Sequence, residues 1–273
     1  MNIKIGFVAE ENEAKTTATK TPETHAKAKT AARRSLVEVY FPDRHFSCTY
    51  YNDVFDLKRG DAVFVEGKLE GLLGRVTSVN YSFKIKLSDY KRIISVAETE
   101  VLGEFHMAGS HFITLDPKAL PYRQARTWFL PPVNEEDETA SSNGGESFFL
   151  GDLGGMKIRE ETADRGHELY TENRVVYIEI NNGRGRAVVI GSRPYELEFG
   201  YNNREISDLV CSCYCAGNCK HEFAAMLQRS ETLRILEEEY NDEFYPDYLA
   251  AVSKLSFFDY AIEHKTHGTV SFE

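Results

Sequence analysis

The sequence lacks any long hydrophobic run, and it has few cysteines outside one short segment. No stretch approaches the roughly 20 consecutive apolar residues of a membrane-spanning helix. Residues 1–10 carry a short apolar patch, but neither the longer apolar core nor the small-residue cleavage site of a secretory signal. Of the five cysteines, only Cys48 lies outside 211–219, which is unlike a disulfide-stapled secreted scaffold. We therefore expect a cytoplasmic protein with no membrane contact.

The motifs of common catalytic classes are also missing. The chain has no G-x-x-x-x-G-K-[ST] phosphate loop and no G-x-S-x-G nucleophile motif. His221 and Glu222 begin like the metalloprotease motif H-E-x-x-H, but Ala225 stands where the second histidine belongs. We therefore expect binding rather than catalysis. An enzyme in the N-terminal half that shows no such motif is the least favoured alternative.

Positive charge is scarce as well. The formal net charge is −11, and the acidic excess lies in 133–170 and 231–273. Acidic and basic side chains balance in 171–230. The chain as a whole therefore has no bulk attraction to phosphate, and any nucleic-acid-binding surface must be local.

Composition divides the chain into four stretches. Residues 1–34 have almost no large apolar side chains after the first few positions, so we expect a disordered tail there. From residue 35, short period-two segments alternate with Gly, Asp and Asn, which predicts a small antiparallel β-barrel-like domain over 35–130. Residues 131–147 are acidic and apolar-poor, as a linker would be. A second domain is expected over 148–273.

The second domain changes from strand patterns to helix patterns along its length. Strands are predicted over 174–180, 186–192 and 195–199, where apolar residues alternate or run together. After His221, apolar residues recur at three- and four-residue steps, which indicates a helix, and a further helix is predicted from Pro246. The predicted fold class is therefore α+β, with a β-rich first domain and a second domain that ends in helices.

One short run contains four cysteines and a histidine, namely Cys211-Ser212-Cys213-Tyr214-Cys215-Ala216-Gly217-Asn218-Cys219-Lys220-His221. Zn²⁺ prefers thiolate and imidazole ligands, usually four in a tetrahedron, so five candidate ligands compete for four places. Strand residues two apart share a face, so Cys211 and Cys213 can reach one metal. In the middle of a helix, side chains two residues apart point in directions about 200° apart. Cys219 and His221 must therefore lie in the turn and first residues of the next helix. We predict a closed structural zinc site, with an iron–sulfur cluster as the metal alternative.

The run resembles the SWIM zinc finger, whose pattern is C-x-C, a spacer, C-x-H and then an apolar helix. Residues 185–195 are similar to the strands before the family's first cysteine, and 219–227 resemble its C-K-H helix start. Cys215 lies within the spacer and departs from the pattern, so it is either a spare thiol or an alternative ligand. The resemblance implies a ββα unit that holds one structural Zn²⁺ through Cys211, Cys213, Cys219 and His221.

The resemblance also implies DNA binding or protein–protein contacts. The first hypothesis is therefore a non-catalytic nucleic-acid-binding module. The second hypothesis is a protein-interaction adaptor, which the acidic overall balance favours. Under the first hypothesis, the candidate phosphate contacts are basic residues near the cysteine run, each of which also fits a solvated strand or turn position: Arg184, Arg186, Arg193 and Lys220.

Overall fold

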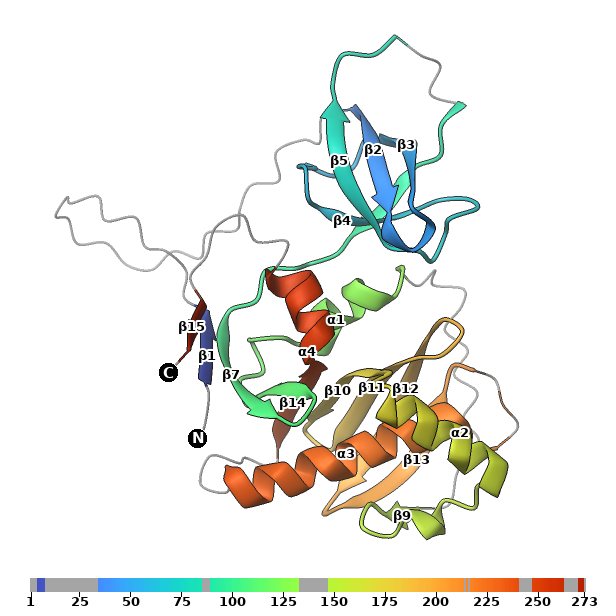
Figure 1. Cartoon of the computed structure of the whole chain (residues 1–273), viewed down its shortest axis with the longest axis vertical. Helices are drawn as coiled ribbons and strands as arrows, with labels where there is room; N and C mark the ends of the chain where they lie inside the picture. The colour runs from blue at the N-terminus through green and yellow to red at the C-terminus, as the bar shows by residue number, and fades with distance from the viewer. Residues whose placement is uncertain are drawn as a thin grey trace, which may run out of the picture. The chain divides into compact units, whose positions relative to one another are not determined.

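The computed structural model describes residues 4–7, 34–84, 89–132, 147–213, 215, 217–240, 247–262 and 270–272 (Figure 1). The chain divides into two compact units, a smaller one over Val8–Ala97 and a larger one over Glu98–Glu273 together with Met1–Phe7. Most of the predicted tail and nearly all of the predicted linker lie outside the described residues.

The smaller unit is an antiparallel sheet with strand order β3-β2-β5-β4-β6. Its strands are β2 (Ser35–Phe41), β3 (Phe46–Asn52), β4 (Ala62–Val65), β5 (Gly74–Asn80) and β6 (Ile93–Val96), and a 3₁₀ turn, Pro42–Arg44, joins the first two. Alternate residues of β2 point into an apolar core, as the period-two pattern predicted.

The smaller unit is not a closed barrel, which corrects the barrel-like prediction. Between the edge strands β3 and β6, the described residues contain one isolated bridge, Tyr51 to Arg92, instead of a continuous ladder. A closed barrel needs every strand paired on both sides, so the sheet stays open.

The larger unit is built on an antiparallel sheet with strand order β15-β1-β7-β8-β14-β10-β11-β12-β13-β9. Its strands are β1 (Lys4–Phe7), β7 (Gly103–Ala108), β8 (His111–Thr114), β9 (Phe148–Phe149), β10 (Val175–Asn181), β11 (Arg184–Ile190), β12 (Pro194–Asn202), β13 (Glu205–Cys211), β14 (Tyr248–Ser253) and β15 (Val270–Phe272). The strands predicted over 174–199 are confirmed. The predicted tail, however, contains β1.

The smaller unit is inserted in the larger one between two paired strands. The last residue of β1, Phe7, pairs with the first residue of β7, Gly103. The chain therefore leaves the sheet and returns to it at neighbouring positions. The first domain was predicted to extend to residue 130, whereas the structure assigns Glu98 onward to the larger unit, because β7 and β8 extend its sheet through β14.

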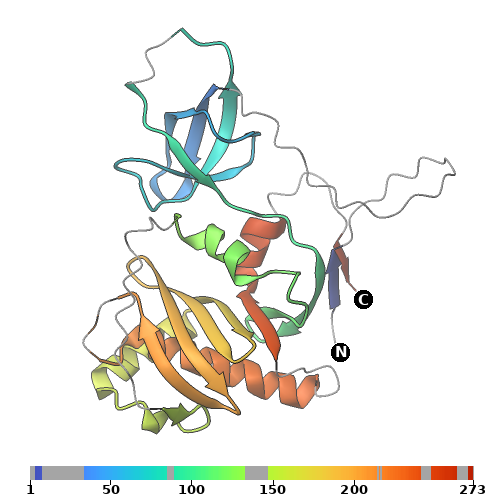
Figure 2. The same cartoon turned by 180° about the vertical axis from the view of Figure 1, so that it is seen from behind.

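Helices cover both faces of the larger sheet. Figures 1 and 2 show α2 (Glu160–Thr171) and α3 (Lys220–Glu239) packed together on one face of β10–β13. Helix α1 (Tyr122–Phe129) contacts the opposite face, where its first residue, Tyr122, donates hydrogen bonds to Glu179 of β10 and Glu196 of β12. Short 3₁₀ (Leu153–Gly155) and π (Phe258–Ile262) turns complete the unit, the latter directly after α4 (Lys254–Phe257).

The segment after Pro246 is a strand where the sequence predicted a helix. Tyr248–Ser253 forms β14, between β8 and β10, and every one of its residues is buried. A short apolar run that is covered on both faces has no period-two signal, so its sequence does not distinguish a strand from a buried helix. Among the helices of the described residues, none is both long and apolar enough to cross a bilayer.

Candidate metal centre

The first two cysteines lie where β13 ends. Cys211 is the last residue of β13 and pairs with Leu197 of β12. Cys213 lies two residues further on, in the turn after the strand, although Ser212 still donates its backbone N–H to the Glu196 carbonyl oxygen. The β-sheet therefore fixes the position of Cys211 directly and that of Cys213 through the short extension beyond it.

The other two candidate ligands lie at the start of α3, as their spacing predicted. Cys219 is the N-cap residue, and its sulfur accepts a hydrogen bond from the Glu222 backbone N–H at 3.5 Å. The Glu222 carboxylate in return accepts the Cys219 backbone N–H at 2.7 Å. This reciprocal pair is a capping box in which a cysteine replaces the usual serine or threonine. It holds Cys219 in place, with His221 in the first helical turn.

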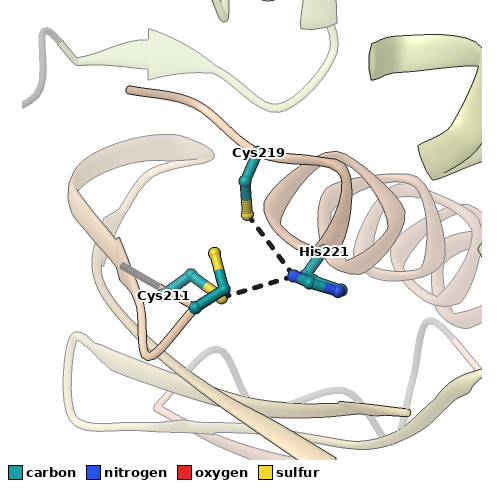
Figure 3. Close-up of side chains that lie close together, drawn as sticks. Cys211, Cys219 and His221 are labelled. Atoms are coloured by element: carbon teal, nitrogen blue, oxygen red, sulfur yellow. Dashed lines mark hydrogen bonds between the residues drawn. The ribbon is translucent and has the colours of Figure 1, made fainter. Parts of the chain in front are cut away.

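The four donor atoms converge on one point. The sulfurs of Cys211, Cys213 and Cys219 and a ring nitrogen of His221 all lie within 4.8 Å of one another. Nδ1 of His221 lies 3.8 Å from the Cys211 sulfur and 3.7 Å from the Cys219 sulfur (Figure 3). Zinc–ligand bonds of ordinary length in a tetrahedron place sulfur and nitrogen about 3.6 Å apart. The residues therefore fit a single tetrahedral ion.

The arrangement leaves no coordination place for a substrate or an activated water. Three thiolates and one imidazole complete a tetrahedral shell, which is the composition of structural zinc sites. A metal held here would join the end of β13 to the first turn of α3. The chemistry that it supplies is cross-linking of the sheet to the helix.

Electrostatics distinguish the three thiols. The hydrogen bond from Cys211 is the largest effect that lowers the pKa of Cys219, to about 4, and further hydrogen bonds from His221 and the Glu222 N–H act in the same direction against burial. The same hydrogen bond raises the pKa of Cys211, and burial raises the pKa of Cys213 to about 12. The cluster thus favours one thiolate, and metal binding would displace the remaining thiol protons.

The remaining cysteine of the run, Cys215, is more exposed than the other three. Cys215 is exposed, whereas Cys211 and Cys213 are half-buried and Cys219 is buried. It does not belong to the group of four converging donors. Its side chain is close enough to hydrogen-bond with that of Cys213, so its role as a spare thiol or an alternative ligand stays a prediction.

The four basic residues singled out in the sequence lie in different surroundings. Arg184 is exposed at the first position of β11, and Arg193 is exposed in the turn after that strand, so about 20 Å of extended chain separates them. Lys220 is the partly exposed first residue of α3. Arg193 and Lys220 therefore flank the metal ligands, and Arg184 does not.

Arg186 is already engaged by other side chains. Its guanidinium lies 3.3 Å from the Glu198 carboxylate and 4.0 Å from that of Glu179. It also lies over the ring of Tyr122, with Cζ 4.9 Å from the ring centroid. An arginine held on three sides is a poor phosphate contact, so Arg186 is the weakest of the four candidates.

Two features of the site were missed in the sequence. Glu222 lies three residues after the N-cap, which is the capping-box spacing, so this signal was available. Tyr195, whose ring stacks on the imidazole of His221, comes from β12 and has no local signal. Its contact with the site depends on how the first turn of α3 packs against β12.

Comparison with known proteins adds no further assignment. No protein-family model matches the chain, and neither a curated protein nor a solved structure matches it. The resemblance to the SWIM pattern therefore rests on the residues of this chain alone.

Proposed function

We propose that this chain is a non-catalytic binding module of the SWIM type, stabilised by one structural Zn²⁺. The observation that carries the proposal is the convergence of three cysteine sulfurs and one histidine nitrogen within 4.8 Å of one another. These atoms come from the end of a strand, β13, and from the start of a helix, α3. The ion would be held by Cys211, Cys213, Cys219 and His221. Because these residues fill a tetrahedral shell, the ion stabilises the fold and takes no part in catalysis.

Zinc is favoured over an iron–sulfur cluster by the donor set. Iron–sulfur clusters are held mostly by four thiolates, and a histidine appears as a ligand in special cases only. A Cys₃His set is one of the common structural zinc shells. The four donor atoms also lie close enough together to bind a single ion. The space between them has no room for a cluster with bridging sulfides.

Metal analysis of the purified chain tests the zinc assignment. We expect about one zinc per chain, lost in Cys219→Ser, because three remaining donors do not complete the shell. Cys48→Ser, which changes a cysteine of the smaller unit, is the matched control and should keep the metal. A brown preparation that contains iron, or a wild-type chain without metal in chelator-free buffer, would contradict the proposal.

We propose nucleic acid as the partner, bound through a local basic surface near the metal centre. Arg193 and Lys220 support this proposal, since both lie beside the metal ligands with their side chains at least partly in solvent. The balanced charge of 171–230 permits local phosphate contacts despite the acidic excess elsewhere. Phosphate contacts of this kind position a protein without conferring sequence preference.

Binding to single- and double-stranded oligonucleotides at increasing salt tests the partner. Each phosphate contact that is removed should reduce the slope of log K against log salt by about 1. Arg193→Gln and Lys220→Gln are expected to reduce that slope and to weaken binding. Arg234→Gln is the matched control, because Arg234 is exposed near the far end of α3 and pairs with Glu238. An absence of binding by the wild-type chain at low salt would rule out the nucleic-acid proposal.

One observation favours the alternative, a protein partner. The last turn of α3 carries the exposed Glu237, Glu238 and Glu239 and no basic residue, although Glu237 pairs with Arg204 and Glu238 with Arg234. Negative side chains at a helix C-terminus are unfavourable, because the helix dipole is negative there. A surface of this kind suits a basic protein partner. A chain that binds no oligonucleotide but binds a polylysine column in low salt would favour this alternative.

A further inference from the structure

The two ring nitrogens of His221 have different surroundings. Nδ1 faces the sulfurs of Cys211 and Cys219 (Figure 3). Nε2 is buried, and it has no hydrogen-bond partner among the described residues. A histidine ligand usually donates its second ring N–H to a carboxylate, a carbonyl or water, and that bond fixes the orientation of the ring. In this site, some other contact must perform that task.

Tyr195, near the start of β12, supports one face of the imidazole instead. The ring of Tyr195 stacks on that of His221, with centroids 4.1 Å apart and planes inclined by 23°. The Tyr195 hydroxyl lies 2.9 Å from Oγ of Ser192, and the guanidinium of Arg193 covers the tyrosine ring at 5.4 Å. Tyr195 is therefore itself held in place, and the imidazole rests against a supported surface.

Gly191 closes the Nε2 side of the imidazole. A methyl group added at this residue would lie 2.7 Å from Nε2 of His221 and 2.9 Å from Cε2 of Tyr195. Both distances are shorter than van der Waals contact. The imidazole thus has room only because this residue has no side chain. Its φ lies outside the left-handed region, so backbone conformation does not require glycine here.

We propose that Gly191 and Tyr195 are positioning residues that force His221 to bind the metal through Nδ1, with the proton kept on the buried Nε2. The inference rests on the proposed metal site and deepens it. A neutral imidazole that donates one nitrogen to a metal keeps its single proton on the other. Here packing and stacking set that choice, in place of a hydrogen-bond acceptor.

The two residues can be perturbed separately. Gly191→Ala adds only a methyl group, which must displace either the imidazole or the tyrosine ring. Tyr195→Leu removes the stacking surface, whereas Tyr195→Phe keeps it and loses only the contact with Ser192. Loss of an outer-shell partner typically lowers metal affinity by about 10–100-fold. We expect losses of that size for Gly191→Ala and Tyr195→Leu, and near wild-type affinity for Tyr195→Phe.

The control for the methyl group is Gly151→Ala. Gly151 is exposed, its φ lies outside the left-handed region, and an added methyl would meet no atom within 4 Å. This variant should bind Co²⁺ as the wild-type chain does. Affinity is measured by competition between the protein and a chelator for Co²⁺, with the thiolate-to-cobalt absorption as the readout.

The wild-type chain alone gives the decisive measurement. Long-range ¹H–¹⁵N spectra of the full chain with Zn²⁺ identify which ring nitrogen of His221 binds metal and which carries the proton. Nδ1 coordination with a protonated Nε2 is expected. Coordination through Nε2 would overturn the inference and leave the zinc proposal intact, whereas a chain that binds neither Zn²⁺ nor Co²⁺ would overturn both. Equal Co²⁺ affinities for Gly191→Ala, Tyr195→Leu and Gly151→Ala would also overturn it.

Discussion

The two faces of strands β10, β11 and β12 are held in different ways. On the α3 face, Ile178, Ala187 and Leu197 lie in a continuous apolar core. On the α1 face, the residues that alternate with them include the charged Glu179, Arg186 and Glu196 beside the buried Tyr177 and Val188. Successive residues of a strand point to opposite faces, so the same three strands carry both arrangements. One face is apolar throughout, and the other combines apolar burial with paired charges.

The charged face is a connected set of ion pairs and hydrogen bonds. Arg186 is the register partner of Glu179 on one side and of Glu198 on the other. The carboxylate of Glu196 accepts two bonds from Arg126 of α1, at 2.6 and 3.1 Å, and the Tyr122 hydroxyl donates to the same carboxylate. Each charge therefore has a partner of opposite sign or a hydrogen bond, which is the condition for covering charged strands with a helix.

The comparison predicts that the apolar face contributes more to stability, and Ile178→Ala tests this on β10. Ile178 is 1% exposed within the α3-face core. Truncating a buried isoleucine to alanine typically lowers the free energy of unfolding by about 2–5 kcal/mol, because transfer energy is lost and a cavity remains. Urea unfolding measures the change. Ile178→Val, which deletes a single methylene, should cost about 0.5–1.5 kcal/mol.

A smaller loss is expected on the charged face for Glu196→Gln. The substitution keeps the shape of the side chain but removes the charge that Arg126 pairs with, and both side chains are only partly exposed. A loss of about 1–3 kcal/mol in the free energy of unfolding should follow. Glu198→Gln is the matched control on β12, with a carboxylate that is mostly in solvent, and should change stability by less than about 0.5 kcal/mol. If Glu196→Gln cost more than Ile178→Ala, the ranking of the two faces would be reversed.

The sequence predicted the apolar face and missed the charged one, for a physical reason. Ile178 and Leu197 give strands whose apolar positions need burial, and the pattern alone shows this. Glu179 and Arg186 read equally well as a solvated face, and only the packing of α1 shows that Glu179 is 2% exposed. The alternating pattern of these strands fixes which residues share a face, but not what covers that face.

The predicted part of the metal site depends on residues close together in the sequence, whereas the missed part depends on contacts between distant segments. The position of Cys219 and His221 at the start of a helix could be predicted from their two-residue spacing, which is a local property. The stacking of Tyr195 on His221 depends on the packing of α3 against β12, and the strand β14 depends on its neighbours β8 and β10. Contacts between segments distant in the sequence leave no periodic signal in either segment.

The charged face should also respond to pH in a way that the apolar face cannot. Burial raises the pKa of Glu179, while the Tyr122 backbone N–H, the charge of Arg186 and a hydrogen bond with Tyr248 lower it without cancelling the effect. Between the ordinary carboxyl pKa and this raised value, the folded state keeps a proton that the unfolded chain has released. Stability therefore falls as pH rises through that window.

Glu179→Gln removes this titration and keeps an oxygen to accept the Tyr122 N–H. Relative to the wild-type chain, the variant should gain stability as pH rises from about 4 towards neutrality, since glutamine pays no cost of ionisation. Melting temperatures at a series of pH values measure the difference. A difference that stays constant with pH would show that the ion pair with Arg186 compensates fully for the burial of Glu179.

The smallest effect is expected at the end of the α3 face, where the metal centre meets solvent. Cys215→Ser removes an exposed thiol that is not one of the four converging donors. Because three cysteines and one histidine complete the shell, zinc content and Co²⁺ affinity should match those of the wild-type chain. Under the same conditions Cys219→Ser should lose the metal. A loss of metal in Cys215→Ser would instead make Cys215 a ligand, and one of the four converging residues would then be the spare.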